Sequence, residues 1–402
     1  MHVIMISPGF PSDMPLFTRG LAQVGAKVYG VGDGGLSPEV RDCLADYLQV
    51  RNLWDEEAVV EQVLEWLRGK EVDRVECLWE PGMVLAARLR ERIGVPGMTV
   101  EQTLPVRDKE SMKQALDRAG LRTPRHTRAS TSAQCREAAE AIGYPLIIKP
   151  IDGAGSADTH KLENGEDLER ALNQLQHVPE VSVEEYIEGE EFTYDTVCGG
   201  GTPLFENVAW YRPKPLLMRQ YAWLSPQSIC VRDLNVAEIQ KGVDLGRKVI
   251  QALGFQAGFT HMEWFLTPEG EAVFGEIGAR APGGRLVHTM NYCCDTDLFS
   301  GWAEAVCYGS FSQPSERRYN AACVFKRARG EGIIRSVEGL EGLFARYGEH
   351  IATVDLTPIG QPKRDHRQMV AGDGWVVVRH PDLQSTLEMA DAVGTDLRLI
   401  AG

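Results

Sequence analysis

The sequence has no long apolar run, no long basic run and no secretory leader pattern. None of its uninterrupted apolar runs approaches the ~20 residues that a membrane span requires. The net charge is −15, and without a basic cluster, nucleic acid and anionic membranes are poor partner candidates. The first residues run directly into a strand pattern with no basic segment before it, so no signal peptide is expected.

Paired cysteine motifs are also missing. Nine cysteines are scattered along the chain, and no two have the Cys-x-x-Cys spacing of a zinc or redox site. An odd number of cysteines also argues against a disulfide framework, and the adjacent Cys293 and Cys294 fit a buried helix face. These features favour a reducing, cytoplasmic location.

Two common nucleotide-binding signatures are absent. The turn after the first strand reads Pro8-Gly9-Phe10-Pro11, which is not the Gly-x-Gly-x-x-Gly of a nicotinamide-binding fold. The Gly-rich stretch at 152–158 lacks the Gly-Lys-Ser/Thr of a Walker A loop. A Rossmann oxidoreductase is therefore disfavoured, and any phosphate site must be of another kind.

The first hundred residues alternate between strand and helix patterns. Strands are expected at His2–Ser7, Lys27–Gly32 and Arg74–Trp79, and helices at Leu16–Val24, Glu56–Arg68 and Gly82–Ile93. This order predicts a parallel, doubly wound α/β sheet. The loop at 8–15 follows the first strand, where such sheets bind ligands, so it is a candidate substrate loop.

The most informative stretch is 261–284. Two strand-forming runs flank the turn Thr267-Pro268-Glu269-Gly270, which predicts a β-hairpin. A four-residue loop would pair Leu266 with Glu271 and Glu263 with Phe274, and Glu276 would lie diagonal to Glu263 on the same face, ~7–8 Å away. The opposite, buried face would carry Met262, Trp264, Leu266, Val273 and Ile277. Two converging carboxylates suit Mg²⁺, although surface acids of a solvated hairpin would give the same pattern.

Two upstream segments are compatible with a bound nucleotide. Lys149 ends an apolar strand at 143–149, and the Gly/Ser-rich loop 152–158 that follows could wrap a phosphate, although a plain hairpin loop would look similar. The acidic run Glu184–Glu191 lies between two strand patterns, where the backbone could contact a flat base. The alternative interpretation of this run is an acidic β-turn with no role in binding.

Taken in this order, the motifs resemble the ATP-grasp superfamily. They are Lys109, Leu146-Ile-Ile-Lys149-Pro150, the 152–158 loop, Glu184-Glu-Tyr-Ile-Glu-Gly-Glu-Glu191, Glu263 and Glu276-Ile-Gly-Ala-Arg280. The resemblance implies an α/β and α+β protein. An N-terminal α/β domain would span 1–100 and an ATP-grasp domain 101–315, with a mobile phosphate-loop subdomain at about 121–188. A C-terminal α+β lid or extension would span 316–402.

The resemblance also assigns roles in ATP binding. Lys109 and Lys149 would contact the phosphates, and Glu263 and Glu276 would hold Mg²⁺, with Mn²⁺ as a substitute. The loop residues Gly153, Gly155 and Ser156 would cover the β- and γ-phosphates. Adenine would meet Glu184, Glu185, Tyr186 and Ile187, and Glu191 would bind the ribose hydroxyls. Gly278 stands where the family often has a metal-binding Asn, which puts a second Mg²⁺ in question.

The implied reaction is ADP-forming ligation of a small carboxylate, activated as an acyl phosphate, to an amine. Arg280 and Lys149 would be catalytic, with Arg280 stabilising the oxyanion. Substrate contacts are expected from the loops 8–15, 212–223 and 283–292, which contribute Lys214, Arg219, Gly283, Gly284 and His288. The alternatives are biotin-carboxylase-like activation of bicarbonate and a non-catalytic ATP sensor. A homodimer is the expected assembly from its general frequency.

Overall fold

A computed structural model describes residues 1–151, 158–365 and 372–402, except for the side chain of Arg219. The predicted loop residues Gly153, Gly155 and Ser156 lie outside the described residues. In the described part of the chain, no helix combines the length and apolar character needed to cross a membrane.

The N-terminal residues form a four-stranded sheet of order β3-β2-β1-β4, with every pair parallel. Its strands are β1 (His2–Ile6), β2 (Lys27–Gly32), β3 (Asp46–Gln49) and β4 (Arg74–Glu76). The helices between and after them are α1 (Met14–Gln23), α2 (Pro38–Arg41), α3 (Glu56–Trp66) and α4 (Met83–Ile93). The predicted parallel α/β sheet is confirmed, and β3 is a strand that the sequence pattern did not indicate.

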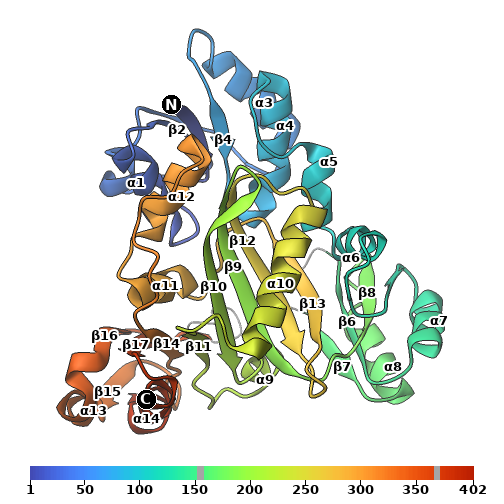
Figure 1. The fold of residues 1–402 in the computed structure, drawn as a ribbon, viewed down its shortest axis with the longest axis vertical. Coiled ribbons are helices and arrows are strands. Elements are labelled where there is room, and N and C mark those ends of the chain that lie inside the picture. Colours follow the sequence, from blue (N-terminus) through green and yellow to red (C-terminus); the bar gives the residue numbers. More distant parts are fainter. Residues whose placement is uncertain (152–157, 366–371) are drawn as a thin grey trace.

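A second four-stranded sheet, of order β5-β8-β6-β7, lies at one side of the molecule (Figure 1). It follows the short helix α5 (Val100–Thr103) and α6 (Lys109–Arg118). Its elements are β5 (His126–Ala129), α7 (Ser132–Ile142), β6 (Leu146–Pro150), β7 (His160–Leu162), α8 (Gly165–Gln174) and β8 (Val181–Glu185). The apolar strand that carries Lys149 is thus an inner strand of this sheet.

The third and largest sheet is antiparallel, of order β13-β12-β9-β10-β11-β14-β17-β16. Its first strands are β9 (Glu190–Gly199), β10 (Thr202–Arg212), β11 (Gln227–Cys230), β12 (Gly258–Leu266) and β13 (Ala272–Gly278). The helix α10 (Ala237–Ala252) covers one face of β9, β12 and β13 (Figure 1). Its apolar side meets Met262, Trp264, Phe274 and Ile277.

The C-terminal residues extend this sheet. Three strands join its far edge: β14 (Asn320–Phe325), β16 (Ile351–Leu356) and β17 (Gly374–His380). The remaining elements are β15 (Ile334–Glu338), α13 (Leu340–Tyr347), α14 (Leu383–Asp396) and β18 (Arg398–Ala401), with β15 and β18 forming a two-stranded sheet. The domain boundaries expected at 100 and 315 stay predictions. The large sheet contains strands from both sides of residue 315.

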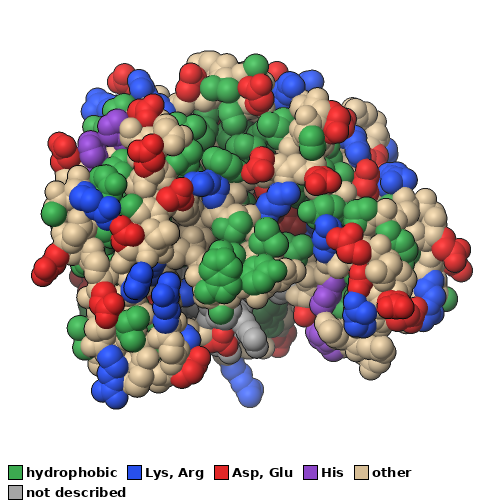
Figure 2. All heavy atoms as spheres, turned by 90° about the horizontal axis from the view of Figure 1, so that it is seen from below, with side chains coloured by type: hydrophobic (Ala, Val, Ile, Leu, Met, Phe, Trp, Pro, Cys, Tyr) green, Lys and Arg blue, Asp and Glu red, His purple; other side chains and the backbone are tan. Residues whose placement is uncertain are grey.

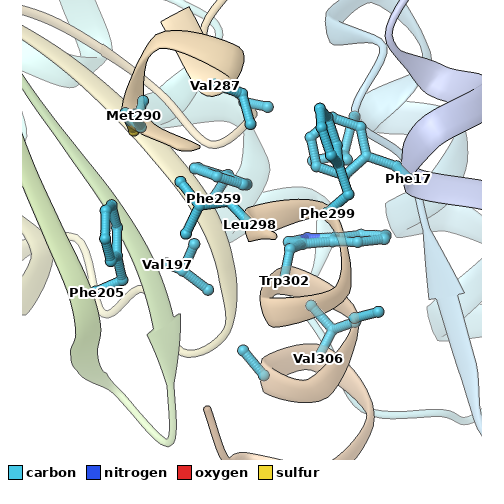
Figure 3. Close-up of a cluster of buried hydrophobic side chains, with 14 of the residues drawn as sticks. Phe17, Val197, Phe205, Phe259, Val287, Met290, Leu298, Phe299, Trp302 and Val306 are labelled. Carbon is cyan, nitrogen blue, oxygen red and sulfur yellow. The ribbon is translucent and has the colours of Figure 1, made fainter. Parts of the chain in front are cut away.

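One hydrophobic core joins the N-terminal part to the large sheet. Phe17 of α1 packs edge-on against Phe259 of β12 and against Phe299 and Trp302 of α12 (Leu298–Tyr308), with ring centroids 4.9–5.9 Å apart (Figure 3). The preceding helix, α11 (Leu286–Cys294), contributes Val287, Met290 and both adjacent cysteines to the same core. This core fixes the loops of the parallel sheet relative to the β12–β13 hairpin.

A partly buried histidine, His126, connects β5 to α6. His126 Nδ1 lies 2.9 Å from Glu110 and Nε2 lies 2.8 Å from Asp117, so both ring nitrogens face carboxylates. Burial lowers the pKa of His126, but the hydrogen bonds to Glu110 and Asp117 outweigh it and leave the pKa raised. The imidazolium form is therefore the stabilising one.

We expect the unfolding free energy to depend on pH through His126. A raised folded-state pKa gives stability that is complete below the unfolded pKa, near 6.5. That stability is lost as pH rises through the folded pKa. Urea unfolding of the wild type and His126→Gln at a series of pH values should show a difference that shrinks as pH rises above ~6.5. A pH-independent difference would contradict this role.

Candidate functional site

The β12–β13 hairpin places two glutamates side by side, but not in the predicted register. Leu266 pairs with Ala272 and Trp264 with Phe274, because the connecting turn is one residue longer than expected. A bulge at Gly275 then shifts the register by one more residue in the same direction, so that Glu263 lies directly opposite Glu276. A Cβ on Gly275 would lie 2.8 Å from the Glu263 carbonyl oxygen, so the bulge needs glycine. Val273 is buried as expected but lies on the other face, because it pairs with Phe265 on the side that carries the glutamates.

These glutamates open onto a cleft of about 280 Å³ between the second sheet and the large sheet. It is lined by nine residues predicted for the nucleotide and metal: Lys109, Lys149, Glu184, Glu185, Tyr186, Ile187, Glu191, Glu263 and Glu276. The predicted substrate residue Lys214 lines it too. Lys161, Leu216, Leu217 and Phe265 are among the lining residues that the sequence did not single out. The structure therefore brings together motifs that are up to 167 residues apart in the sequence.

Positive and negative groups alternate through the cleft. Lys109 Nζ lies 3.6 Å and Lys149 Nζ 3.9 Å from a carboxylate oxygen of Glu276. Burial raises the pKa of Glu276, but the charges of Lys109 and Lys149 outweigh it and leave the pKa below its ordinary value. Glu276 is therefore ionised at neutral pH, as a metal ligand must be.

A second set of ion pairs lies next to the first and joins Lys113, Glu184 and Lys149. Lys113 was not predicted from the sequence. Lys113 is fully buried, and its Nζ lies 2.8 Å from Glu184; Lys149 Nζ lies 3.1 Å from the other oxygen of the same carboxylate. Burial raises the pKa of Glu184, yet the two lysines hold it well below its usual range. The Glu184 carboxylate thus fixes both lysines, and the adenine contact expected of it stays a prediction.

The predicted base-binding segment connects β8 to β9. The backbone N–H of Glu185 donates to the Arg125 carbonyl at 2.8 Å. This N–H is therefore already used, and only the backbone carbonyl of Glu185 could accept a hydrogen bond from a base. The Lys161 ammonium lies over the ring of Tyr186, 4.0 Å from the ring centroid. Burial, followed by the charges of Glu263 and Glu276, raises the pKa of Glu191 well above its ordinary value. Glu191 lines the cleft, and the ribose contact expected of it stays a prediction.

The candidate metal site is a pair of carboxylates, and their role as ligands stays a prediction. In the described residues, no three His, Cys, Asp or Glu side chains form a preassembled metal cluster. Hard oxygen donors at Glu263 and Glu276 fit Mg²⁺, provided that phosphate oxygens complete its coordination. Gly278 adds no side-chain ligand, as the sequence indicated.

His261 lies beside this pair in a buried network. Its Nδ1 lies 2.6 Å from Asp195, which also accepts hydrogen bonds from Thr193 and Asn207, and its Nε2 lies 3.7 Å from Glu263. Burial lowers the pKa of His261, but Asp195 and Glu263 raise it to about 9. Asp195 was not predicted, and the protonated imidazole is better placed to orient Glu263 than to accept a proton.

Arg280 lies outside the residues that line the cleft, and its partner is Glu80. Its Nε donates to Glu80 at 2.6 Å, and Arg107 donates to the other oxygen of Glu80 at 2.5 Å. Burial lowers the pKa of Arg280, but Glu80 outweighs it and leaves the pKa raised. Glu80 follows β4 of the N-terminal sheet, so this ion pair connects the parallel sheet to the segment that follows the β12–β13 hairpin.

Two of the three predicted substrate loops meet. Arg285 donates to Asp13 at 3.0 Å, and His288 Nε2 lies 3.6 Å from the same carboxylate. The Arg285 guanidinium also lies over the ring of Trp375 at 4.2 Å, so β17 contributes to this corner. Gly283 and Gly284 lead into α11 beside it. The third predicted loop, 212–223, contains a helix instead. This helix, α9 (Pro215–Gln220), has Pro215 in its first turn. The side chain of Arg219 is not among those described.

The exterior carries both charge signs. Lysine, arginine, aspartate and glutamate side chains are interspersed over the face in Figure 2, with no continuous basic patch there. This distribution agrees with the acidic net charge of −15.

Comparison with known proteins identifies the fold. Residues 106–208 match the family model of the ATP-grasp domain. The crystal structure of an L-amino acid ligase from Bacillus licheniformis superimposes with a TM-score of 0.79 and 19% identity, covering 100% of this chain and 98% of that one. This chain has the ATP-grasp fold.

Two further proteins are similar to this chain. The L-arginine-specific L-amino acid ligase of Bacillus subtilis is 30% identical over 231 residues, which is 56% of this chain and 55% of that protein. The chain thus spans little more than half the length of that curated relative. The biotin carboxylase domain of a Hydrogenobacter thermophilus 2-oxoglutarate carboxylase, in complex with MgADP, ADP and bicarbonate, has a TM-score of 0.68 at 17% identity and covers 99% of this chain and 90% of that one.

Proposed function

We propose that this ATP-grasp protein is an ATP- and Mg²⁺-dependent ligase that joins a small carboxylate to an amine. The observation that carries the proposal is the cluster of Lys109, Lys149 and Glu276 in the cleft, opposite Glu263. Lysines and carboxylates in this arrangement suit a nucleoside triphosphate that arrives with its cation. Amino-acid-like substrates are supported by the names of the ligase relatives.

The chemistry balances without a protein nucleophile. An oxygen of the substrate carboxylate attacks the γ-phosphorus of ATP, and ADP leaves, which gives an acyl phosphate. The amine nitrogen then attacks the carbonyl carbon, phosphate leaves and the nitrogen loses a proton. Mg²⁺ held by Glu263 and Glu276, or Mn²⁺ in its place, would neutralise charge on the phosphates.

The residues of this chain position the reactants and stabilise charge. Lys109 and Lys149 bind phosphate oxygens, and Glu184 holds Lys149 in place from behind. Arg280 donates toward the oxyanion of the tetrahedral state, oriented by Glu80. The corner formed by Asp13, Arg285 and His288 offers both charge signs to an amino-acid-like substrate.

Two finer features belong to the same proposal. A reducing, cytoplasmic setting is supported by nine cysteines that are all free. A homodimer is proposed from the general frequency of two-fold assemblies, and sedimentation would test it.

The deciding experiment measures phosphate release from ATP and Mg²⁺ across a panel of amino acids, offered singly and in pairs. We expect release to require an acid and an amine together, and mass spectrometry of the product would name both. Release with bicarbonate alone would instead favour the carboxylase-like alternative, which the similarity to the biotin carboxylase domain keeps open. Bound ATP with no release under any condition would favour a sensor.

A further inference from the structure

A second cavity, of about 310 Å³, lies between the parallel sheet and the large sheet. It shares no lining residue with the nucleotide cleft. Gly258 and Phe259 at the start of β12 line it, whereas Glu263 lies four residues further along that strand, ~13 Å away. Pro96 and Gly97 line it and are exposed, so the cavity opens to solvent there.

One arginine of the lining is held in a fixed position. Arg90 Nε donates to the Val75 carbonyl at 2.8 Å, and Nη1 donates to the Met98 carbonyl at 3.3 Å. Its side chain crosses Gly97, where a Cβ would lie 2.6 Å from Arg90 Cδ and where φ is +140°. Nη2 remains 3.9 Å from Glu76, which is beyond hydrogen-bond length, so it keeps donor capacity on the cavity side.

A buried donor faces the same space. Trp302 is fully buried, and its indole N–H has no hydrogen-bond partner in the described structure. This nitrogen lies next to Gly258, since a Cβ there would be 3.8 Å from it. An unsatisfied buried N–H is costly, so an acceptor placed in the cavity would recover free energy.

The rest of the cavity lining is mostly apolar, and its charged side chains include more arginines than carboxylates. Arg74 and Arg90 oppose a single carboxyl, that of Glu76, whose pKa is raised by burial despite both arginines. Apolar side chains cover the rest of the surface: Leu78, Met83, Met98, Phe255 and Phe259. A ligand that suits these walls carries a carboxylate at one end, an acceptor in the middle and an apolar body.

We propose that this cavity is a binding site for a small N-acylated amino acid with an apolar side chain. Its carboxylate pairs with Arg74 and Arg90, its amide carbonyl accepts from the Trp302 indole, and its side chain packs against Met98 and Phe255. If the proposed function is correct, such a molecule belongs to the product class of the ligation. The binding itself does not depend on that function.

The site is placed to influence the ion pair that supports catalysis. Leu78 lines the cavity two residues before Glu80, and Ala279 lines it one residue before Arg280. A ligand that moves either segment would shift the Arg280 guanidinium. The occupied cavity would therefore alter use of the acid substrate, a consequence that rests on the proposed function.

Isothermal titration calorimetry of the full chain with N-acetyl-L-leucine tests the site directly and needs no turnover. We expect binding that weakens at least ~10-fold in Arg74→Met, which removes a charge partner, and in Ala257→Leu, which fills the cavity. Both positions are only half-buried, and thermal melting would verify that the variants fold. N-acetyl-L-leucinamide, which lacks the carboxylate, should bind at least ~10-fold more weakly than the acid.

Two controls locate the ligand. Arg92→Met alters α4, the helix that carries Arg90. Arg92 is exposed and pairs with Glu61 at 2.7 Å, so the affinity for N-acetyl-L-leucine should not change. Lys149→Met alters the nucleotide cleft, and affinity should again be unchanged. No binding at millimolar concentration, wild-type affinity in either cavity variant, or loss of binding in Lys149→Met would each overturn the proposal, whether or not the protein proves to be a ligase.

Discussion

Glu276→Gln is expected to lower ADP formation by roughly a thousand-fold while the protein remains folded. Glutamine keeps the size of the side chain but removes the charge that faces Lys109 and Lys149. It also leaves Glu263 as the only charged ligand of the hairpin for Mg²⁺. A site whose third family ligand is already replaced by Gly278 has little capacity to absorb that loss.

The measurement is initial-rate ADP release with the substrate pair found in the panel, accompanied by thermal melting. Glu271→Gln is the matched control, because Glu271 belongs to the same hairpin but is exposed and pairs with Arg122 on the outside. Its turnover should equal that of the wild type. Unchanged turnover in a folded Glu276→Gln protein would remove the metal role from this residue.

Local sequence patterns predicted the elements around the cleft better than their register. The hairpin at 261–284 was correctly expected to direct Glu263 and Glu276 to one face, but for the wrong geometric reason. A four-residue turn would have placed them diagonally; the longer turn and the bulge at Gly275 place them directly opposite. The longer turn and the bulge each shift the register by one residue in the same direction, so the glutamates stay on one face but pair directly. Neither feature leaves a strong local signal.

Lys113 was missed although a signal existed. It lies four residues after Lys109 in α6, so both lysines share one helix face. A lysine with no exposed surface requires a buried carboxylate, and Glu184 supplies it. Recognising that face would have added Lys113 to the candidate site.

Other features depend on contacts that no local pattern encodes. Glu80 and Arg280 are 200 residues apart, and their pairing follows from how the parallel sheet docks through Phe17 and Trp302. A C-terminal α+β lid or extension was expected. That three of its strands continue the large sheet was not, because partner choice between strands is set by tertiary packing.

Lys113→Met is expected to lower the free energy of unfolding by about 3–5 kcal/mol. Lys113 Nζ lies 2.8 Å from Glu184, and both side chains are almost completely buried. Glu184 pairs with both Lys113 and Lys149. When Lys113 is removed, the buried carboxylate keeps only the Lys149 partner of this pair, at 3.1 Å. Lys149 is then drawn more strongly to Glu184, so ATP affinity should fall as well.

A second substitution separates the cost of the unpaired charge from the cost of lost packing. In Lys113→Met/Glu184→Gln the carboxylate is gone, and urea unfolding should show a smaller loss than in Lys113→Met alone. Because the folded-state pKa of Glu184 is depressed below 4.5, its stabilisation is present above that pH and is lost as pH falls further. The double variant should lack this part of the acid dependence. A double variant as unstable as the single one would mean that Lys113 stabilises the fold through packing of its aliphatic stem, and the charge chain behind the cleft would then serve only to orient Lys149.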